Sequence, residues 1–342
     1  MQFRQLFGRP KGHFIAYWCV TLLLRLESRF VGVLREFHRT KGQRLMLMNP
    51  SPQAVTGFVL LATGLSGCSG PTHATTSVPL TSPIIVRKDL SYGTGQHRSY
   101  DLYLPAAASP KPPLLVFVHG GAWITGDKRQ FEPMGQRFAQ LGVAVAVVNY
   151  TLSARAGNPP VPQPSKDLAQ FLASVCRQDP AFDPDRVFLM GHSAGAHTIA
   201  LLAARPELLT EAGLPKAQWP KGYIGVEGIY DLPKLVETFP AYRNEFVEQA
   251  FGLKAALTKG SPSLQPIGSK APWILVHSTL DDLVDPLQSQ EFADHLRSQG
   301  VVVSYTEGML GRHEEVIEDM NVSQTAIDDT IRTFVMAPHL EP

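Results

Sequence analysis

The 342-residue chain has few cysteines and almost no net charge, and each shortage excludes a class of protein. Two of its three cysteines, Cys19 and Cys68, lie near the N-terminus, so Cys176 stands alone in the rest of the chain and a disulfide framework is excluded there. The 31 basic and 30 acidic residues give a formal net charge of +1. Because the two signs are interspersed, nucleic acid and strongly acidic substrates are not expected as partners.

The sequence also lacks the usual signatures of cofactor sites. No group of Cys and His has the spacing of metal ligands, and no glycine-rich phosphate loop follows a strand, so we expect neither a metal nor an organic cofactor. The hydrophobic content of 44% is ample for a sizeable core. The length fits one large α/β domain with additional segments.

Residues 1–45 form a basic N-terminal extension in which Glu27 and Glu36 are the acidic residues. Its apolar patch, residues 14–24, is too short to span a bilayer. Two interpretations are open. The extension is either a basic segment that lies on a membrane surface, or a stretch that the mature protein does not carry because synthesis starts at Met46 or Met48. We favour the second, because an export-signal pattern follows.

Residues 46–68 resemble a bacterial lipoprotein signal. An apolar core over residues 54–65 ends in Leu65-Ser66-Gly67-Cys68, and cleavage before Cys68 would free its thiol to carry a lipid. A plain secretory signal and a buried helix are the alternatives. Residues 69–83 are rich in Ser, Thr, Pro and Gly and predict a flexible linker. We therefore expect an exported protein that is lipid-anchored to a bacterial membrane, with a soluble secreted or periplasmic protein as the alternative.

Residues 186–204, RVFLMGHSAGAHTIALLAA, predict a strand, a sharp turn and a helix. The apolar run 187–190 is typical of a parallel strand buried on both faces, although a buried helix gives the same pattern. Ser193 lies on the turn, where Gly191 and Gly195 leave room for close backbone approach. Because the helix starts there, the N–H of Ala194 and the positive end of the helix dipole would face an oxyanion beside the serine.

A second glycine-containing loop follows the apolar strand 114–118. Its residues, His119-Gly120-Gly121-Ala122-Trp123, include two adjacent glycines that let backbone N–H groups turn into a cavity. With this loop before G-x-S-x-G, the sequence resembles the α/β-hydrolase family, whose lipase and esterase branch carries an HGGG-type loop. The resemblance implies an oxyanion hole made by the N–H groups of Gly121, Ala122 and Ala194.

The resemblance also places the acid and the base. The strand 273–277 is followed by STLDDLVDP, which resembles the family pattern G-T-x-D-x-x-V-P and assigns the acid to Asp281, with Asp282 as a rival. His313, after the last predicted strand, is the base. The order Ser, Asp, His is that of the family, and since each follows a strand, Ser193, Asp281 and His313 should meet at one edge of the sheet. His119 and His192 are expected to support or pack.

Alternating apolar and helical segments predict an α/β fold with a mostly parallel, doubly wound sheet flanked by helices, over a catalytic domain of residues 84–342. A hairpin over 84–92 and 99–104 is expected at the sheet edge. No large lid is expected between 230 and 272. The other expected strands are 143–148, 222–229 and 301–305, and the expected helices are 130–141, 166–176, 291–298 and 323–336.

These features predict a serine carboxylic-ester hydrolase that cleaves small acyl esters through a Ser-Asp-His triad and an acyl-enzyme. The alternatives are an arylformamidase that hydrolyses N-formylkynurenine or another amide hydrolase, and a non-catalytic binding protein on the same fold. The expected partner is thus a small-molecule ester or formamide. Trp123 either packs an aromatic substrate or belongs to the core. Glu227 stands at a strand end where such relatives often have serine.

Overall fold

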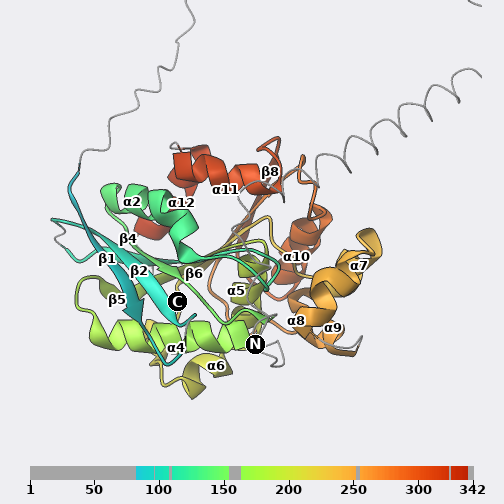
Figure 1. The fold of residues 1–342 in the computed structure, drawn as a ribbon, viewed down its shortest axis with the longest axis horizontal. Helices are drawn as coiled ribbons and strands as arrows, with labels where there is room; N and C mark the ends of the chain where they lie inside the picture. The colour runs from blue at the N-terminus through green and yellow to red at the C-terminus, as the bar shows by residue number, and fades with distance from the viewer. Residues whose placement is uncertain are drawn as a thin grey trace, which may run out of the picture. The chain divides into compact units, whose positions relative to one another are not determined.

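The computed structural model describes residues 82–337, apart from 96, 108–109, 154–162, 252–254 and 323–324. Within this part, eight strands form one sheet in the order β1-β2-β4-β3-β5-β6-β7-β8 (Figure 1). β2 is antiparallel to both of its neighbours, β1 and β4. β1 therefore runs in the same direction as β4, β3, β5, β6, β7 and β8, which are parallel to one another. The strands are β1 (Ile84–Ser91), β2 (Ser99–Pro105), β3 (Pro113–Val118), β4 (Ala144–Val148), β5 (Asp183–His192), β6 (Gly222–Val226), β7 (Trp273–Ser278) and β8 (Val303–Gly308).

Helices cover both faces of this sheet, because the central strands are apolar on both sides and must be shielded from water on both. One face packs against α4 (Gln163–Gln178), α5 (Ala194–Ala204), α6 (Glu207–Glu211) and α10 (Leu287–Ser298). The other face packs against α2 (Glu132–Gln140), α11 (His313–Val322) and α12 (Ala326–Met336), which lie together on one side of the sheet in Figure 1. The predicted doubly wound α/β sheet is confirmed.

A third apolar cluster includes Trp123 of the glycine loop and residues of the segment between β6 and β7. In the described part of that segment the longest helix, α7 (Leu232–Thr238), has seven residues, so the prediction that no long lid is inserted here is confirmed. Its other elements are the π-helical turn Arg243–Val247, α8 (Glu248–Phe251), α9 (Ala255–Gly260) and the 3-10 turn Pro262–Leu264. Two further 3-10 turns, Lys128–Phe131 and Lys216–Gln218, precede α2 and β6.

One helix was missing from the sequence-based expectation. The structure continues from His313 into α11, whereas the sequence predicted a loop at residues 311–313 and assigned no element between it and the helix expected over 323–336. Val316, Ile317 and Met320 are buried against the same side of the sheet as α2. Their spacing forms one helical stripe, and the acidic first turn favours a helix start.

Two strand boundaries also differ from the prediction. β6 ends at Val226 rather than at residue 229, because Glu227 takes a positive φ of 49° that interrupts the extended backbone. β8 covers Val303–Gly308 rather than 301–305, and since its residues alternate between half-buried and exposed, apolar composition marks its ends poorly.

The predicted basic extension, the signal segment with Cys68 and all but the last two residues of the predicted linker lie outside the described residues. Within the described part, no helix combines the length and apolar content that crossing a membrane requires.

Candidate active site

Ser193 occupies a tight turn between β5 and α5. Its backbone lies at φ 53° and ψ −121°, a region that non-glycine residues avoid, and its N–H donates a hydrogen bond to the carbonyl oxygen of Val226 at 2.9 Å. The flanking glycines are required by space. A Cβ at Gly191 would lie 2.5 Å from the carbonyl of Gly195, and a Cβ at Gly195 would lie 2.0 Å from the carbonyl oxygen of Val118. The turn thus has the strained geometry predicted for a nucleophile elbow.

The glycine loop after β3 lies against this turn and is strained as well. Gly121, Ala122 and Trp123 have φ values of 105°, 50° and 62°, and the carbonyl oxygen of Gly121 accepts the N–H groups of Ile124 and Thr125 at 3.0 Å each. Within the described part of the chain, the N–H groups of Gly121, Ala122 and Ala194 donate to no other residue. These three groups therefore remain available as donors to a bound oxyanion.

His119 holds the base of this loop in place. Its ring is buried and stacks on Tyr150 with centroids 4.6 Å apart, and the Tyr150 hydroxyl donates to the carbonyl oxygen of His119 at 2.9 Å. Burial lowers the pKa of His119, so the ring is neutral and acts in packing, as the sequence indicated.

Asp281 and His313 form a buried pair. Nδ1 of His313 donates to Oδ2 of Asp281 at 2.7 Å, while Oδ1 of Asp281 accepts the N–H groups of Leu283 and Val284 at 2.9 and 2.8 Å. The carboxylate comes from the loop after β7 and the imidazole from the first residue of α11. Both are brought to the carboxyl edge of the sheet, where Ser193 also lies.

The electrostatics of this pair suit a proton shuttle. Burial pushes the pKa of Asp281 up, but hydrogen bonds from His277 and His313 outweigh it and hold this pKa well below its ordinary value. Burial lowers the pKa of His313, yet the hydrogen bond and charge of Asp281 leave it raised overall. Asp281 is therefore ionised at neutral pH, and it favours the imidazolium form of His313.

The rival acid, Asp282, lies apart from the imidazole. Its side chain is 45% exposed and stands 3.8 Å from the guanidinium of Arg312. Of the two candidates considered from the sequence, Asp281 is the one that contacts His313.

His277 is a member of the site that sequence reasoning did not assign. It is the penultimate residue of β7, its Nε2 donates to Oδ2 of Asp281 at 3.0 Å, and its Nδ1 lies 2.7 Å from the Ser289 hydroxyl. Ser289 therefore fixes the tautomer that presents an N–H to Asp281. The four-residue spacing from His277 to Asp281 carried no recognisable signal, because the contact depends on the turn between them.

Trp123 is enclosed by protein. Its side chain is 1% exposed, its indole N–H donates to Nδ1 of His197 at 3.2 Å, and its ring lies edge-on to Phe251 with centroids 4.8 Å apart. Of the two roles left open by the sequence, these contacts favour the core.

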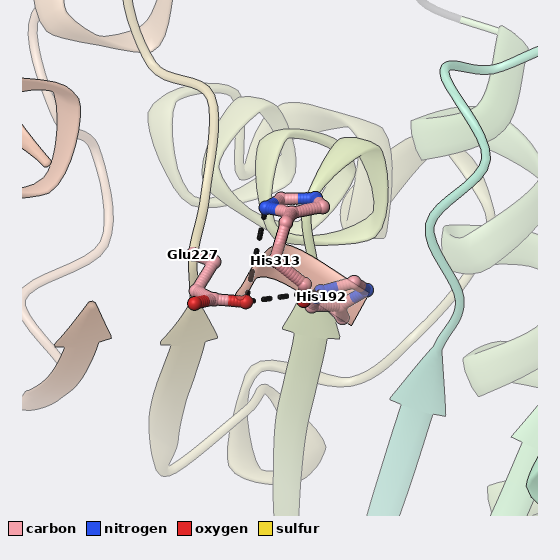
Figure 2. A group of neighbouring side chains, drawn as sticks. All are labelled: His192, Glu227 and His313. Atoms are coloured by element: carbon pink, nitrogen blue, oxygen red, sulfur yellow. Dashed lines mark hydrogen bonds and ion pairs between the residues drawn. The ribbon is translucent and has the colours of Figure 1, made fainter. Parts of the chain in front are cut away.

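Glu227 adds a second carboxyl beside His313. Figure 2 shows Glu227 at the end of β6 reaching toward His192 and His313, with Oε2 3.4 Å from Nε2 of His192 and 3.7 Å from Nδ1 of His313. Each of these three residues offers one nitrogen or oxygen atom, and the three atoms lie within 4.8 Å of one another. That spacing is short enough for all three to bind one metal ion. However, Nδ1 of His313 bonds Asp281, and Nε2 of His192 donates to the carbonyl oxygen of His313 at 3.1 Å. The two ring nitrogens that face Glu227 are thus already engaged in other hydrogen bonds.

Comparisons with known proteins agree with this architecture. The model of the BD-FAE family matches residues 100–296. The chain is 34% identical to the isoprenylcysteine alpha-carbonyl methylesterase of Arabidopsis thaliana over 63% of this chain and 53% of that protein. It is 28% identical to the kynurenine formamidase of Meyerozyma guilliermondii over 63% of this chain and 83% of that protein. The chain therefore spans about half the length of the plant relative.

A solved structure shares the fold. Esterase B from Lactobacillus rhamnosis superposes with a TM-score of 0.62 at 21% identity, over 73% of this chain and 85% of that chain. The predicted α/β-hydrolase fold is confirmed.

Proposed function

Because the chain belongs to the BD-FAE family, we propose that it is a serine carboxylic-ester hydrolase that acts on small acyl esters. The observation that carries the proposal is the buried contact of 2.7 Å between Nδ1 of His313 and Asp281, at the same sheet edge as the strained turn of Ser193. This arrangement supplies a nucleophile, a base and an acid that orients the base.

Each group then has one task in the reaction. His313 takes the hydroxyl proton on Nε2 as Oγ of Ser193 attacks the ester carbonyl, and Asp281 keeps the Nδ1–H in place and stabilises the imidazolium. The N–H groups of Gly121, Ala122 and Ala194 bind the oxyanion. His313 returns the proton to the leaving alcohol, and the same steps with water release the acyl group from Ser193.

The second candidate is an arylformamidase, for which the match to a kynurenine formamidase over 83% of that protein is the specific support. The same groups would attack a formyl carbonyl, with an arylamine leaving in place of an alcohol. The two activities differ in the leaving group and in the pocket that holds it, so substrate preference separates them.

The deciding experiment is to measure kcat/KM of the full chain on a short aryl ester and on N-formylkynurenine. We expect the ester to be turned over faster, Ser193→Ala to abolish both activities, and Ser298→Ala, an exposed serine on α10, to leave them unchanged. A preference for the formamide of more than about a hundredfold, or roughly 3 kcal/mol in transition-state binding, would replace the ester assignment. A chain that turns over neither substrate and whose Ser193 resists an organophosphate would be a binding protein.

We further propose that the protein is exported and lipid-anchored through Cys68, on the sequence pattern of residues 54–68. Metabolic labelling with a fatty acid should mark the wild-type chain and the control Cys176→Ser, whose cysteine lies in the catalytic domain, and should fail to mark Cys68→Ser. Labelling that persists in Cys68→Ser would contradict the anchor. An unmarked chain recovered outside the cytoplasm would support the soluble alternative.

A further inference from the structure

Glu227 is held in an unusual backbone position beside the site. It is the first residue after β6, its φ of 49° is one that a non-glycine residue adopts at a cost, and its N–H donates to the carbonyl oxygen of Val276 at 2.8 Å. The end of β6 and the neighbouring strand β7 therefore fix its backbone, and the side chain is directed at His192 and His313 (Figure 2).

Ordinary packing does not account for this carboxyl. Its side chain is 0% exposed, and within the described part of the chain neither carboxyl oxygen accepts or donates a hydrogen bond. A buried polar group without a hydrogen bond is costly, and a carboxyl is among the costliest. Two ring nitrogens approach it, Nε2 of His192 at 3.4 Å and Nδ1 of His313 at 3.7 Å, and the backbone N–H of Ser278 also favours its charged form.

Two carboxyls thus face one ring nitrogen. Asp281, after β7, lies 2.7 Å from Nδ1 of His313, and Glu227, after β6, lies 3.7 Å from the same atom. A shift of about 0.8 Å would bring Oε2 of Glu227 to the usual hydrogen-bond distance of roughly 2.9 Å. The side-chain torsions of a glutamate can supply that shift while its backbone stays fixed.

We propose that Glu227 is a second acid for His313, a positioning residue that takes the Nδ1–H when the side chain of Asp281 is missing. The inference rests on the proposed function and deepens it. His313 would still receive the Ser193 proton on Nε2, and the positive charge of the imidazolium would be balanced by Glu227 instead of Asp281.

The charge states of the two carboxyls, Asp281 and Glu227, are consistent with this role. Burial raises the pKa of Glu227 to about 8, and the negative charge of Asp281 adds to the rise, so the pair carries one negative charge at neutral pH. Removing Asp281 removes one cause of the rise. The carboxylate of Glu227 then becomes easier to form at the moment when His313 needs it.

The proposal is tested by a double-mutant cycle on the full chain, with the rate of phosphonylation of Ser193 as the readout, because that rate needs no knowledge of the substrate. We expect Glu227→Gln to lower the rate by a smaller factor in the wild-type chain than in Asp281→Ala. Asp281→Ala should lose about 10²-fold, and Asp281→Ala with Glu227→Gln about 10⁴-fold, the scale on which loss of a triad acid acts. Asp281→Asn should be slower than Asp281→Ala, because its amide occupies the space that Glu227 needs.

Glu314→Gln is the matched control, since Glu314 is an exposed acid next to His313. Paired with Asp281→Ala, it should cause little further loss. If Glu227→Gln lowers the rate of phosphonylation by the same factor in wild type and in Asp281→Ala, Glu227 has a structural role only, and the proposal is overturned.

A second readout separates this inference from the proposed function. The low-field proton resonance of His313 Nδ1–H, identified by its loss in His313→Gln, should persist in Asp281→Ala and vanish when Glu227→Gln is added. A wild-type chain that resists phosphonylation would contradict the hydrolase assignment. A resonance that is already lost in Asp281→Ala would contradict the role of Glu227, whatever the activity.

Discussion

Two carboxyl groups, those of Asp281 and Glu227, lie 2.7 and 3.7 Å from Nδ1 of His313, and their pKa values are shifted in opposite directions. Both are buried, which raises the pKa of a carboxyl. Asp281 receives hydrogen bonds from His277 and His313 and has a lowered pKa, whereas Glu227 receives none of comparable quality and has a raised one. At the scale of single residues, the number of donors aimed at a carboxyl decides its charge.

The first prediction concerns the acid of the triad. Asp281→Asn should lower kcat/KM by about 10³ to 10⁴, because an amide presents the wrong partner to Nδ1–H and removes the charge that stabilises the imidazolium. Without that charge the pKa of His313 should fall, so the acid limb of the pH–rate profile should move to lower pH. Asp282→Asn, the adjacent exposed acid, should leave both the rate and the profile unchanged. The reverse ranking would make Asp282 the acid.

The second prediction concerns the stability contributed by Glu227. Its pKa in the folded chain is about 8, above that of an unfolded glutamate, so its contribution to the free energy of unfolding is complete below about pH 4.5 and is lost as pH rises toward 8. The groups that face it are His192, His277, His313 and Asp281. The glutamine of Glu227→Gln does not titrate, so the variant does not lose stability in this way. The Tm of the variant minus that of wild type should therefore increase between pH 5 and pH 8.

Thermal unfolding at several pH values would measure that difference. The exposed control Glu314→Gln should give a flat difference over the same range. A flat difference for Glu227→Gln would mean that the Glu227 carboxyl titrates near its ordinary pKa.

At the scale of secondary-structure elements, the contact between α5 and the end of β3 leaves no room for a side chain at Gly195. A Cβ there would lie 2.0 Å from the carbonyl oxygen of Val118 and 2.6 Å from that of His119. Gly195→Ala should therefore displace the turn of Ser193 and reduce both Tm and the rate of Ser193 labelling. Gly308→Ala, whose Cβ would meet only the Leu310 side chain at 3.8 Å or more, should be nearly neutral. Comparable effects of the two changes would contradict this account.

A buried ion pair between Lys128 and Asp101, extended by the exposed Asp89, ties the edge hairpin to the turn before α2. Nζ of Lys128 donates to the buried carboxylate of Asp101 on β2 and, at 2.7 Å, to Asp89 on β1. Lys128→Met would leave the charge of Asp101 buried without its partner and should cost about 3–5 kcal/mol of the free energy of unfolding. Lys234→Met, which breaks an exposed pair with Glu291, should cost less than about 1 kcal/mol in the same denaturant titration. Similar losses in the free energy of unfolding for the two variants would show that water reaches Asp101 and replaces its partner.

The sequence predicted elements well where one local rule determined them. α5 has the predicted bounds, Ala194–Ala204, because glycines and a serine mark its start and a dense apolar run marks its length. The stretch that became α11 is mostly polar, so its three-residue stripe was overlooked. Ser193, Asp281 and His313 follow strands and could be placed by motif. The role of His277 and the approach of Glu227 to His313 depend on how neighbouring strand ends meet, which no local pattern records.

At the scale of the whole molecule, burial is graded across the sheet. β3 and β7 are buried along their full length, whereas β1 and β8, at the two edges, are half-buried or exposed throughout. Amide hydrogens of β3 and β7 should therefore exchange through large-scale opening and be the slowest, and those of β1 and β8 should exchange faster. Hydrogen exchange followed by mass spectrometry of peptides from the four strands would measure this, with the denatured chain as the reference. Equal protection in β8 and β3 would contradict it.

The direction of β1 determines at which end of the sheet the chain enters the domain. β1 and β4 are both antiparallel to β2, so β1 runs with the parallel strands, and Ile84 enters the sheet at the end opposite Ser193. The 15 residues of the predicted linker would extend at most about 50 Å. With the proposed anchor at Cys68, a flexible tether of this reach would let the domain turn freely beside the bilayer, so the anchor would set the distance of the enzyme from the membrane and not its orientation.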